Sequence, residues 1–290
     1  MGNLIWGIAV AAVVALVAAT FWWAAGAYRR SLRSARNDHS RRPALWNRFY
    51  AHDWGDTTTN NYGFAPAEGD DPQRFQQQMY REMLAMLAAR RPLAPGVKLL
   101  EVSCGRGGGL AAFLAKAPDV FDATGLDVAA SAIKFCRKTY GERDGLRFVE
   151  GSALDLPFDD ASFDVILNVE ASNDYGDRPR FFSEVARVLK PDGVFLYTDT
   201  CYADRRDALE QDMADAGFAT EFRDITANVV EACRADSPRR RAVIRSRAPL
   251  LARLVLGRQL ENYTAVEGSK KFAKFASGRR AYLMTAAVKK

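Results

Sequence analysis

A short apolar segment that runs directly into a glycine-rich turn constrains the fold of this chain more than any other feature. Residues 97–102 read Val-Lys-Leu-Leu-Glu-Val, and Ser-Cys-Gly-Arg-Gly-Gly-Gly follows at 103–109. Glycine permits a sharp turn and lets the backbone approach a ligand closely. A helix that begins after the turn directs unpaired N–H groups at that ligand. The segment therefore predicts a strand, a turn and a helix that hold a nucleotide-type cofactor.

The same alternation continues along the chain. Residues 121–127 form a second apolar run that ends in Asp127, and a carboxylate at this point suits the two hydroxyls of a ribose. Alternating strands and helices predict a parallel sheet covered on both faces, with ligands at the carboxyl ends of the strands. Further strands are predicted near 146–149, 163–168, 193–199, after Gly217 and at 280–288, and helices near 73–91, 107–116, 129–139, 179–189 and 203–216.

Several longer motifs narrow the class. They are Glu-Val-Ser-Cys-Gly-x-Gly-Gly-Gly at 101–109, Gly-Leu-Asp at 125–127, Ile-Lys-Phe-Cys at 133–136 and Leu-Asn-Val-Glu-Ala-Ser at 167–172. The succession resembles class I S-adenosylmethionine-dependent methyltransferases, most closely the phthiotriolone/phenolphthiotriolone dimycocerosate O-methyltransferase group and more distantly the sterol and tocopherol methyltransferases. The resemblance implies a Rossmann-like seven-stranded α/β fold and S-adenosylmethionine as cofactor. The segments after Asp127 do not fit an NAD-dependent oxidoreductase.

The resemblance also implies cofactor contacts at individual positions. Ser103 stands where many methyltransferases have a glycine, and Ser152 stands where an aspartate commonly binds the adenine amino group. The implied contacts are Glu101 to the turn and the methionyl ammonium, Ser103, Gly105 and Gly107 in the turn, Asp127 to the ribose, Val128 beside the adenine, Ser152 and Ala153 at its edge, and the Asn168 backbone carbonyl.

Catalysis requires an acceptor atom held in line with the transferred methyl group, and a hydroxyl acceptor must also lose a proton. Relatives commonly place a histidine after the Val-Glu-Ala-Ser motif, whereas this chain has Asn173, Asp174 and Tyr175. Asparagine cannot take a proton at neutral pH. Asp199, at the end of the fifth predicted strand, is therefore the first candidate for the base, with Asn173 and Tyr175 as further catalytic candidates. A helix-capping or loop role for Asp199 is the alternative.

The N-terminus carries a long uncharged segment. Residues 4–28 contain no charged side chain, and at ~1.5 Å per residue a helix of this length crosses a ~30 Å hydrocarbon layer. The segment predicts a single-pass membrane anchor at 1–28, with a cleaved signal peptide as the alternative. Seven arginines against one aspartate follow in residues 29–48, so the positive-inside rule places the catalytic domain on the cytoplasmic side.

Charge and metal-ligand patterns limit the partners. The arginines of residues 29–48 account for the whole net charge of +6, so the folded domain is not basic overall and nucleic acid is not expected as a substrate. Residues 228–260 predict a helical insertion before the last strand. Its arginines at 239–258 and interspersed leucines suit either a solvated helix or contact with a bilayer surface. The four cysteines form no C-x-x-C pair, so no metal site is expected.

Together these features predict an anchor at 1–28, a basic juxtamembrane linker and lid at 29–72, and a methyltransferase domain at 73–290 with its insertion at about 228–260. The predicted function is that of a membrane-anchored methyltransferase that O-methylates a hydroxyl of a hydrophobic small molecule. Two alternatives remain open at this point: C-methylation in the sterol or tocopherol manner, and a non-catalytic cofactor-binding scaffold.

Overall fold

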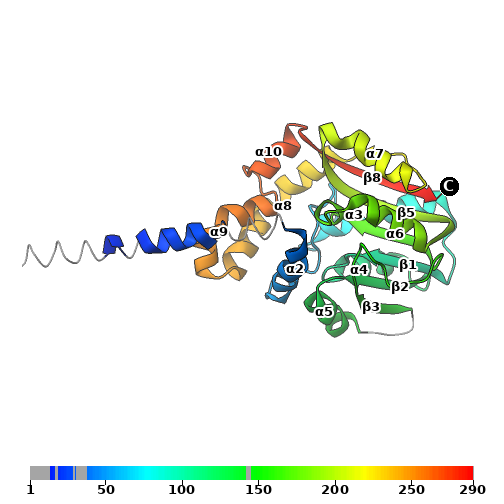
Figure 1. Cartoon of the computed structure of the whole chain (residues 1–290), viewed down its shortest axis with the longest axis horizontal. Coiled ribbons are helices and arrows are strands. Elements are labelled where there is room, and N and C mark those ends of the chain that lie inside the picture. Colours follow the sequence, from blue (N-terminus) through cyan, green and yellow to red (C-terminus); the bar gives the residue numbers. More distant parts are fainter. Residues whose placement is uncertain (1–13, 17–18, 29, 31–37, 142–144, 290) are drawn as a thin grey trace, which may run out of the picture.

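A mixed β-sheet organises the computed structural model, which describes residues 14–16, 19–28, 30, 38–141 and 145–289. Within these residues the strand order is β3-β2-β1-β4-β5-β8-β6, and β7 also pairs with β8 (Figure 1). The strands are β1 (Val97–Val102), β2 (Phe121–Asp127), β3 (Leu146–Glu150), β4 (Phe163–Val169), β5 (Leu189–Tyr202), β6 (Phe218–Ala219), β7 (Arg223–Asp224) and β8 (Arg280–Lys289).

Helices cover both faces of this sheet. Along β1, Leu99 enters one apolar cluster while Leu100 and Val102 enter the other, because alternate side chains of a strand point to opposite faces. The helices are α2 (Arg42–Ala51), α3 (Arg74–Arg90), α4 (Gly108–Lys116), α5 (Ala130–Tyr140), α6 (Arg178–Val188), α7 (Arg206–Asp215), α8 (Thr226–Arg247), α9 (Leu250–Tyr263) and α10 (Lys270–Ala276), with short 3-10 helices η1 (His39–Arg41), η2 (Ser172–Asp174) and η3 (Ala203–Arg205). Helices α3 and α4 pack in the first cluster, and α6 and α7 in the second.

The sheet has the predicted Rossmann-like arrangement, but it contains eight strands in the described residues where seven were predicted, and β8 runs against the others. Strands β1 to β5 pair in parallel, whereas β8 is antiparallel to β5 from Val194–Val288 to Tyr202–Arg280. The strand order reverses between β1 and β4, and the carboxyl ends of strands meet a crevice at such a reversal. The segment predicted as a helical insertion, at about 228–260, contains α8 and α9, and α10 follows it before the last strand.

The predicted membrane anchor at residues 1–28 is not supported. None of the helices in the part of the chain that the structure describes is long and apolar enough to cross a membrane. Within the predicted anchor, the described helical residues are 14–16 and 19–28, which is shorter than the ~20 apolar residues of a typical span. Residues 1–13 and 17–18 lie outside the described residues. The finding contradicts both the predicted transmembrane helix and the predicted single-pass membrane localisation.

The predicted linker and lid contains a helix that sequence analysis did not anticipate. Asp38 caps η1 through the backbone N–H of Ser40, and Pro43 occupies the first turn of α2, where its missing N–H costs nothing. Helix α2 docks on α5, because Asn47 accepts hydrogen bonds from the backbone N–H and the hydroxyl of Ser131 at 2.8 and 2.6 Å. The segment is therefore fixed to the domain by specific contacts.

Part of the basic insertion points inward. Arg240 is buried on α8, pairs with Asp236 at 2.9 Å and donates to the backbone carbonyls of Tyr62 and Thr264. Arg239 pairs with the same aspartate at 2.6 Å. Arg240 thereby holds the loop before α3 and the end of α9 against α8. The interpretation of the whole 239–258 segment as a solvated basic face is therefore wrong for its first turn.

Candidate active site

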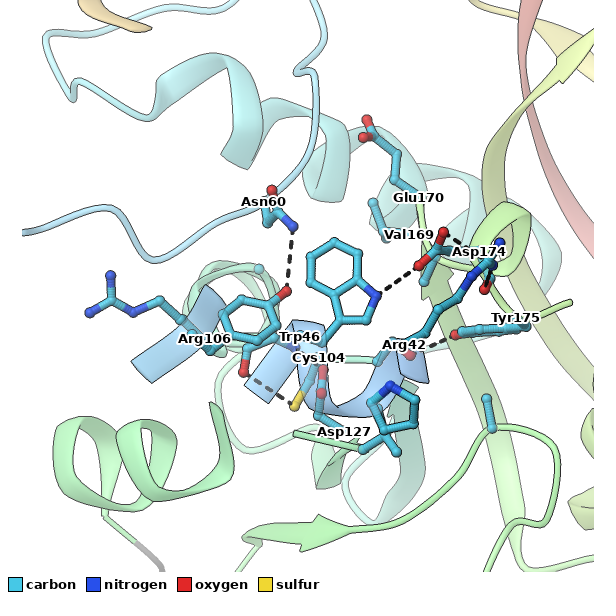
Figure 2. Close-up of a pocket in the computed structure, with 18 of the residues that line it drawn as sticks. Arg42, Trp46, Asn60, Cys104, Arg106, Asp127, Val169, Glu170, Asp174 and Tyr175 are labelled. Carbon is cyan, nitrogen blue, oxygen red and sulfur yellow. Dashed lines mark hydrogen bonds and ion pairs between the residues drawn. The ribbon is translucent and has the colours of Figure 1, made fainter. Parts of the chain in front are cut away.

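The pocket lies where the carboxyl ends of β1, β2 and β4 meet, at the reversal of strand order. Its walls come from the glycine-rich turn after β1, the ends of β2 and β4, the loop after β3 and helix α2 (Figure 2). Asp127, Glu170 and Asp174 bring carboxylates to this pocket, and Trp46 and Tyr50 bring aromatic rings. The pocket therefore combines an acidic edge with an apolar cover.

The glycine-rich turn has the backbone that its sequence requires. Gly105 and Gly107 adopt φ values of 55° and 72°, which glycine tolerates without steric cost. Ser103 also lies in the left-handed region, at φ 62°, and its hydroxyl is 2.7 Å from that of Tyr175. A Cβ on Gly109 would lie 1.8 Å from Cζ of Tyr80. The turn thus admits no side chain where Tyr80 packs against it.

Asp127 joins two of the predicted cofactor elements. Its carboxylate accepts hydrogen bonds from the backbone N–H groups of Gly105 and Ala129, both at 2.9 Å. Burial raises the pKa of this carboxyl, and the two backbone donors act in the opposite direction. Because Asp127 lines the pocket, the remaining acceptor capacity of its oxygens is available to ribose hydroxyls.

Glu101 carries an unsatisfied oxygen behind the turn. Its Oε1 accepts a hydrogen bond from the hydroxyl of Tyr80 at 2.8 Å, and Tyr80 lines the pocket. Its buried Oε2 has no hydrogen-bond partner among the described residues, and burial raises the pKa of the carboxyl to about 8. A buried polar atom without a partner is costly, so this carboxyl suits an ammonium donor from a bound ligand.

Some of the other predicted cofactor residues line the pocket, and Asn168 lies behind its wall. Val128, Ser152 and Ala153 line the pocket. Asn168 is buried beside it, and its Nδ2 donates to the carbonyl of Val102 at 3.0 Å and to the Tyr175 hydroxyl at 2.8 Å. Asn168 therefore braces β1 and Tyr175 with its side chain, a function not foreseen from its backbone carbonyl.

The predicted base, Asp199, is fully buried and does not line the pocket. Its carboxylate accepts four hydrogen bonds: from the hydroxyl of Ser172 at 2.6 Å, from the backbone and side-chain amides of Asn173 at 2.9 and 2.7 Å, and from the backbone N–H of Thr200 at 2.6 Å. Asn173 is exposed and also lies outside the pocket wall, whereas Tyr175 is part of it. The geometry thus brings Tyr175, but not Asp199, to the pocket.

Glu170 is a pocket residue that sequence analysis passed over. It follows β4 directly, adopts φ 53° and reaches the pocket half-buried. Its Oε1 accepts hydrogen bonds from the backbone N–H of Tyr62 at 2.5 Å and from the hydroxyl of Tyr282. Burial raises the pKa of this carboxyl to about 8. The available signal was its position, since an acid directly after a strand lies at the carboxyl edge of the sheet.

Helix α2 closes one side of the pocket. Figure 2 shows Trp46 and Arg42 directed at Asp174, with Trp46 Nε1 donating to its carboxylate at 2.8 Å and Arg42 paired with it at 3.1 Å. Tyr50 stacks on Trp46 with ring centroids 5.7 Å apart and accepts a hydrogen bond from Asn60 at 3.4 Å. Trp46 and Tyr50, from the segment at 29–72, therefore line the pocket.

Comparisons with known proteins agree with this geometry. A family described as methyltransferase domain matches residues 100–197. Phthiotriol/phenolphthiotriol dimycocerosates methyltransferase of Mycobacterium leprae (strain TN) is 35% identical, covering 74% of this chain and 76% of the relative. Fatty-acid O-methyltransferase of Mycolicibacterium smegmatis is 44% identical over 47% of each chain. The solved structure of geranyl diphosphate methyltransferase in complex with SAM superposes with a TM-score of 0.61 at 18% identity, covering 80% of this chain and 99% of that one.

Proposed function

Because this chain belongs to the S-adenosylmethionine-dependent methyltransferases, we propose that its pocket holds a hydroxyl of a lipid-like molecule for O-methylation, with Glu170 as the base. The enzyme uses S-adenosylmethionine, and relatives at 35% and 44% identity are methyltransferases, so the alternative of a non-catalytic scaffold is not supported. The observation that carries the proposal is that Glu170, an acid with a raised pKa, is one of the residues that line the pocket.

The polar groups in and behind the pocket would contact the bound cofactor. When bound, S-adenosylmethionine supplies an electrophilic methyl group. Asp127 would hold the ribose hydroxyls, and the unpaired Oε2 of Glu101 would accept from the methionyl ammonium. Val128, Ser152 and Ala153 would border the adenine. The turn at Ser103, Gly105 and Gly107 would allow the close approach of backbone and ligand.

The charges around the pocket favour a hydroxyl over a carboxylate acceptor. The two relatives compared above are named for a phthiotriol and for a fatty acid. A fatty-acid carboxylate is already deprotonated at neutral pH and would need a cation beside it. Arg42 already pairs with Asp174, and Arg106 donates to the carbonyls of Gly55 and Thr57. A carboxylate acceptor would instead meet Glu170, and the ionised form of Glu170 would repel it.

Glu170 meets the requirements of a general base for a hydroxyl. Its Oε1 is held by two donors, and no described residue forms a hydrogen bond to its Oε2. The acceptor oxygen would bond to the methyl carbon while the methyl–sulfur bond of the cofactor breaks and the thioether product leaves, and the proton of its O–H bond would pass to Oε2 of Glu170. A pKa of about 8 makes the carboxylate more basic than an exposed glutamate while leaving part of it ionised at neutral pH.

Asp199 and its neighbours have a supporting role in this proposal. By accepting from Ser172, Asn173 and Thr200, the carboxylate fixes η2. That short helix leads into Tyr175, whose hydroxyl contacts Ser103 and Asn168. We therefore assign Asp199 and Asn173 to positioning, and Tyr175 to the wall that separates the acceptor from the cofactor turn.

The cover of the pocket supports a hydrophobic acceptor. Besides the stacked Trp46 and Tyr50, Phe49 packs edge-on against Tyr263 with ring centroids 5.7 Å apart. Aromatic surfaces contribute apolar contact area and exclude water from a closed site. An aromatic wall could also stabilise a cationic intermediate of C-methylation. The identity of the methylated atom must therefore be measured.

The decisive experiment follows a labelled methyl group. Purified protein, S-[methyl-14C]adenosylmethionine and either a long-chain diol or the matching fatty acid are incubated, and the lipid products are hydrolysed. A methyl ether resists mild alkali and is cleaved by strong acid, a methyl ester is cleaved by alkali, and a C-methyl group survives both. Alkali-stable, acid-labile label from the diol supports O-methylation of a hydroxyl. Label confined to the fatty acid as an ester, or label on carbon, would reject the proposed reaction.

A further inference from the structure

The C-terminal part of the chain holds the proposed base from behind. Tyr282, on β8, is fully buried and donates its hydroxyl proton to Oε1 of Glu170. The backbone N–H of Tyr62 donates to the same oxygen at 2.5 Å. Two donors on one oxygen fix the rotation of the carboxylate, so its second oxygen is directed by residues more than one hundred positions away in the chain.

A cation lies behind the same group. Lys271, on α10, donates its ammonium proton to the Tyr62 hydroxyl and lies 5.1 Å from the centroid of the Tyr62 ring and 5.4 Å from that of Tyr263. Its positive charge lowers the pKa of Glu170, against the larger effect of burial. The buried Asp199 acts in the opposite direction and raises that pKa.

Other titratable groups also face Glu170. Its charge raises the pKa values of phenols and of one thiol around it, which identifies them as its electrostatic neighbours. These groups are Tyr62 from the loop before α3, Tyr80 from α3, Cys233 from α8, Tyr263 from α9 and Tyr282 from β8. Among these described neighbours Lys271 is the cation, so the ionised form of Glu170 depends on it and on the Tyr282 donor.

We propose that Tyr282 and Lys271 are positioning residues for methyl transfer: the hydroxyl of Tyr282 orients the Glu170 carboxylate, and the ammonium of Lys271 favours its ionised form. The proposal rests on Glu170 being the base. Both residues lie outside the region 100–197 that matches the methyltransferase domain. Helix α10 and the last strand would thus complete an active site whose cofactor half lies in the common fold.

Loss of Tyr282 or Lys271 should change the pH dependence of methyl transfer. A hydrogen bond to a carboxylate and a nearby cation both favour the charged form and lower its pKa. Removing either one raises the pKa of Glu170 above its present value of about 8. The rate depends on the carboxylate form, so the midpoint of the rise in kcat/KM with pH should move upward. A residue that only supports the fold would change the amount of active enzyme without moving that midpoint.

Two variants test this, each with a matched control. Tyr282→Phe keeps the ring that packs on Phe275 and Tyr62, and Lys271→Met keeps most of the aliphatic stem. The controls are Tyr202→Phe and Lys274→Met, whose hydroxyl and ammonium group bond to each other at 2.9 Å at the surface, outside the pocket wall. Full-length proteins are compared by kcat, by kcat/KM against pH and by calorimetric cofactor binding.

We expect Tyr282→Phe to lower kcat by about 10-fold and to raise the pH midpoint by about one unit, the order of effect of one hydrogen bond to a charged group. Lys271→Met should raise the midpoint in the same direction. Cofactor affinity should stay within about twofold in both variants, and the controls should match the wild type. If Tyr282→Phe does not fold, Lys271→Met still measures the midpoint.

A double-mutant comparison separates this proposal from the assignment of the base. If Tyr282 acts through Glu170, adding Tyr282→Phe to Glu170→Gln should cause no further loss of turnover. An inactive Glu170→Gln together with wild-type midpoints in Tyr282→Phe and Lys271→Met would overturn the positioning proposal and leave the base in place. Full activity of Glu170→Gln would overturn the base itself, and the positioning proposal with it.

Discussion

Asp127 accepts a hydrogen bond from the backbone N–H of Gly105 at 2.9 Å, which fastens the turn after β1 to the end of β2. The same carboxylate accepts from Ala129 and lines the pocket. One side chain thus fixes the turn and lines the pocket, where we propose that it accepts hydrogen bonds from a ribose. Loss of this carboxylate should therefore weaken cofactor binding more than acceptor binding.

Asp127→Ala should weaken S-adenosylmethionine binding by about 1–3 kcal/mol, because it removes the partners of ribose hydroxyls and of the Gly105 N–H. Isothermal titration calorimetry measures the change. Asp122→Ala, on the same strand but outside the pocket wall, is the matched control and should bind as the wild type does. Unchanged affinity in Asp127→Ala would remove the ribose contact from the site.

Glu170→Gln should lower kcat by about 10²–10⁴-fold, the usual contribution of a positioned base, while leaving cofactor affinity unchanged. Asp199→Asn should cost less turnover and more stability, because Asp199 lies outside the pocket wall and holds η2 through four accepted hydrogen bonds. Steady-state kinetics and thermal melting of both variants give the comparison. The reverse ranking of turnover would return the role of base to Asp199.

The pH dependence of wild-type turnover follows from the raised pKa of Glu170. The group must be ionised to accept a proton, so kcat/KM should increase with pH below about 8 and level off above it. An exposed glutamate would give a plateau from about pH 5 upward. A flat profile between pH 6 and pH 9 in buffers of constant ionic strength would contradict an essential Glu170.

The buried pair between Arg240 and Asp236 should matter for stability. Arg240→Met leaves the Asp236 carboxylate with one cation fewer and the carbonyls of Tyr62 and Thr264 without their donor, so we expect a loss of about 3–5 kcal/mol. Arg206→Met, which breaks an exposed pair with Glu210, should cost no more than about 1 kcal/mol. Urea unfolding measures both, and equal costs would refute the distinction.

Two glycine-to-alanine substitutions, one after the cofactor turn and one in α9, should have opposite effects on stability. Gly109→Ala should destabilise the protein by about 1–3 kcal/mol, because its Cβ would overlap the Tyr80 ring. Gly257→Ala, inside α9 with open space around it, should stabilise by up to about 1 kcal/mol through helix propensity. Thermal melts of the two variants should therefore shift in opposite directions.

Local sequence patterns were sufficient to predict the central strands and the cofactor turn. The strands at 97–102 and 121–127 were predicted to the residue, because apolar runs bounded by glycine or aspartate depend on nearby chemistry alone. The turn followed from glycine, since the left-handed backbone of Gly105 and Gly107 is a local property. The predicted membrane span is contradicted, because no helix of the described residues is long and apolar enough to cross a membrane.

Only the tertiary structure decided which polar side chains reach the acceptor. Glu170 directly follows β4 and lines the pocket, whereas Asp199 lies within β5 and is enclosed by η2. Arg240 looked like one of many surface arginines, yet it is buried against carbonyls contributed by distant loops. Sequence spacing determined the elements and the cofactor turn; the contacts of these side chains depend on packing between segments far apart in the chain, which no local pattern records.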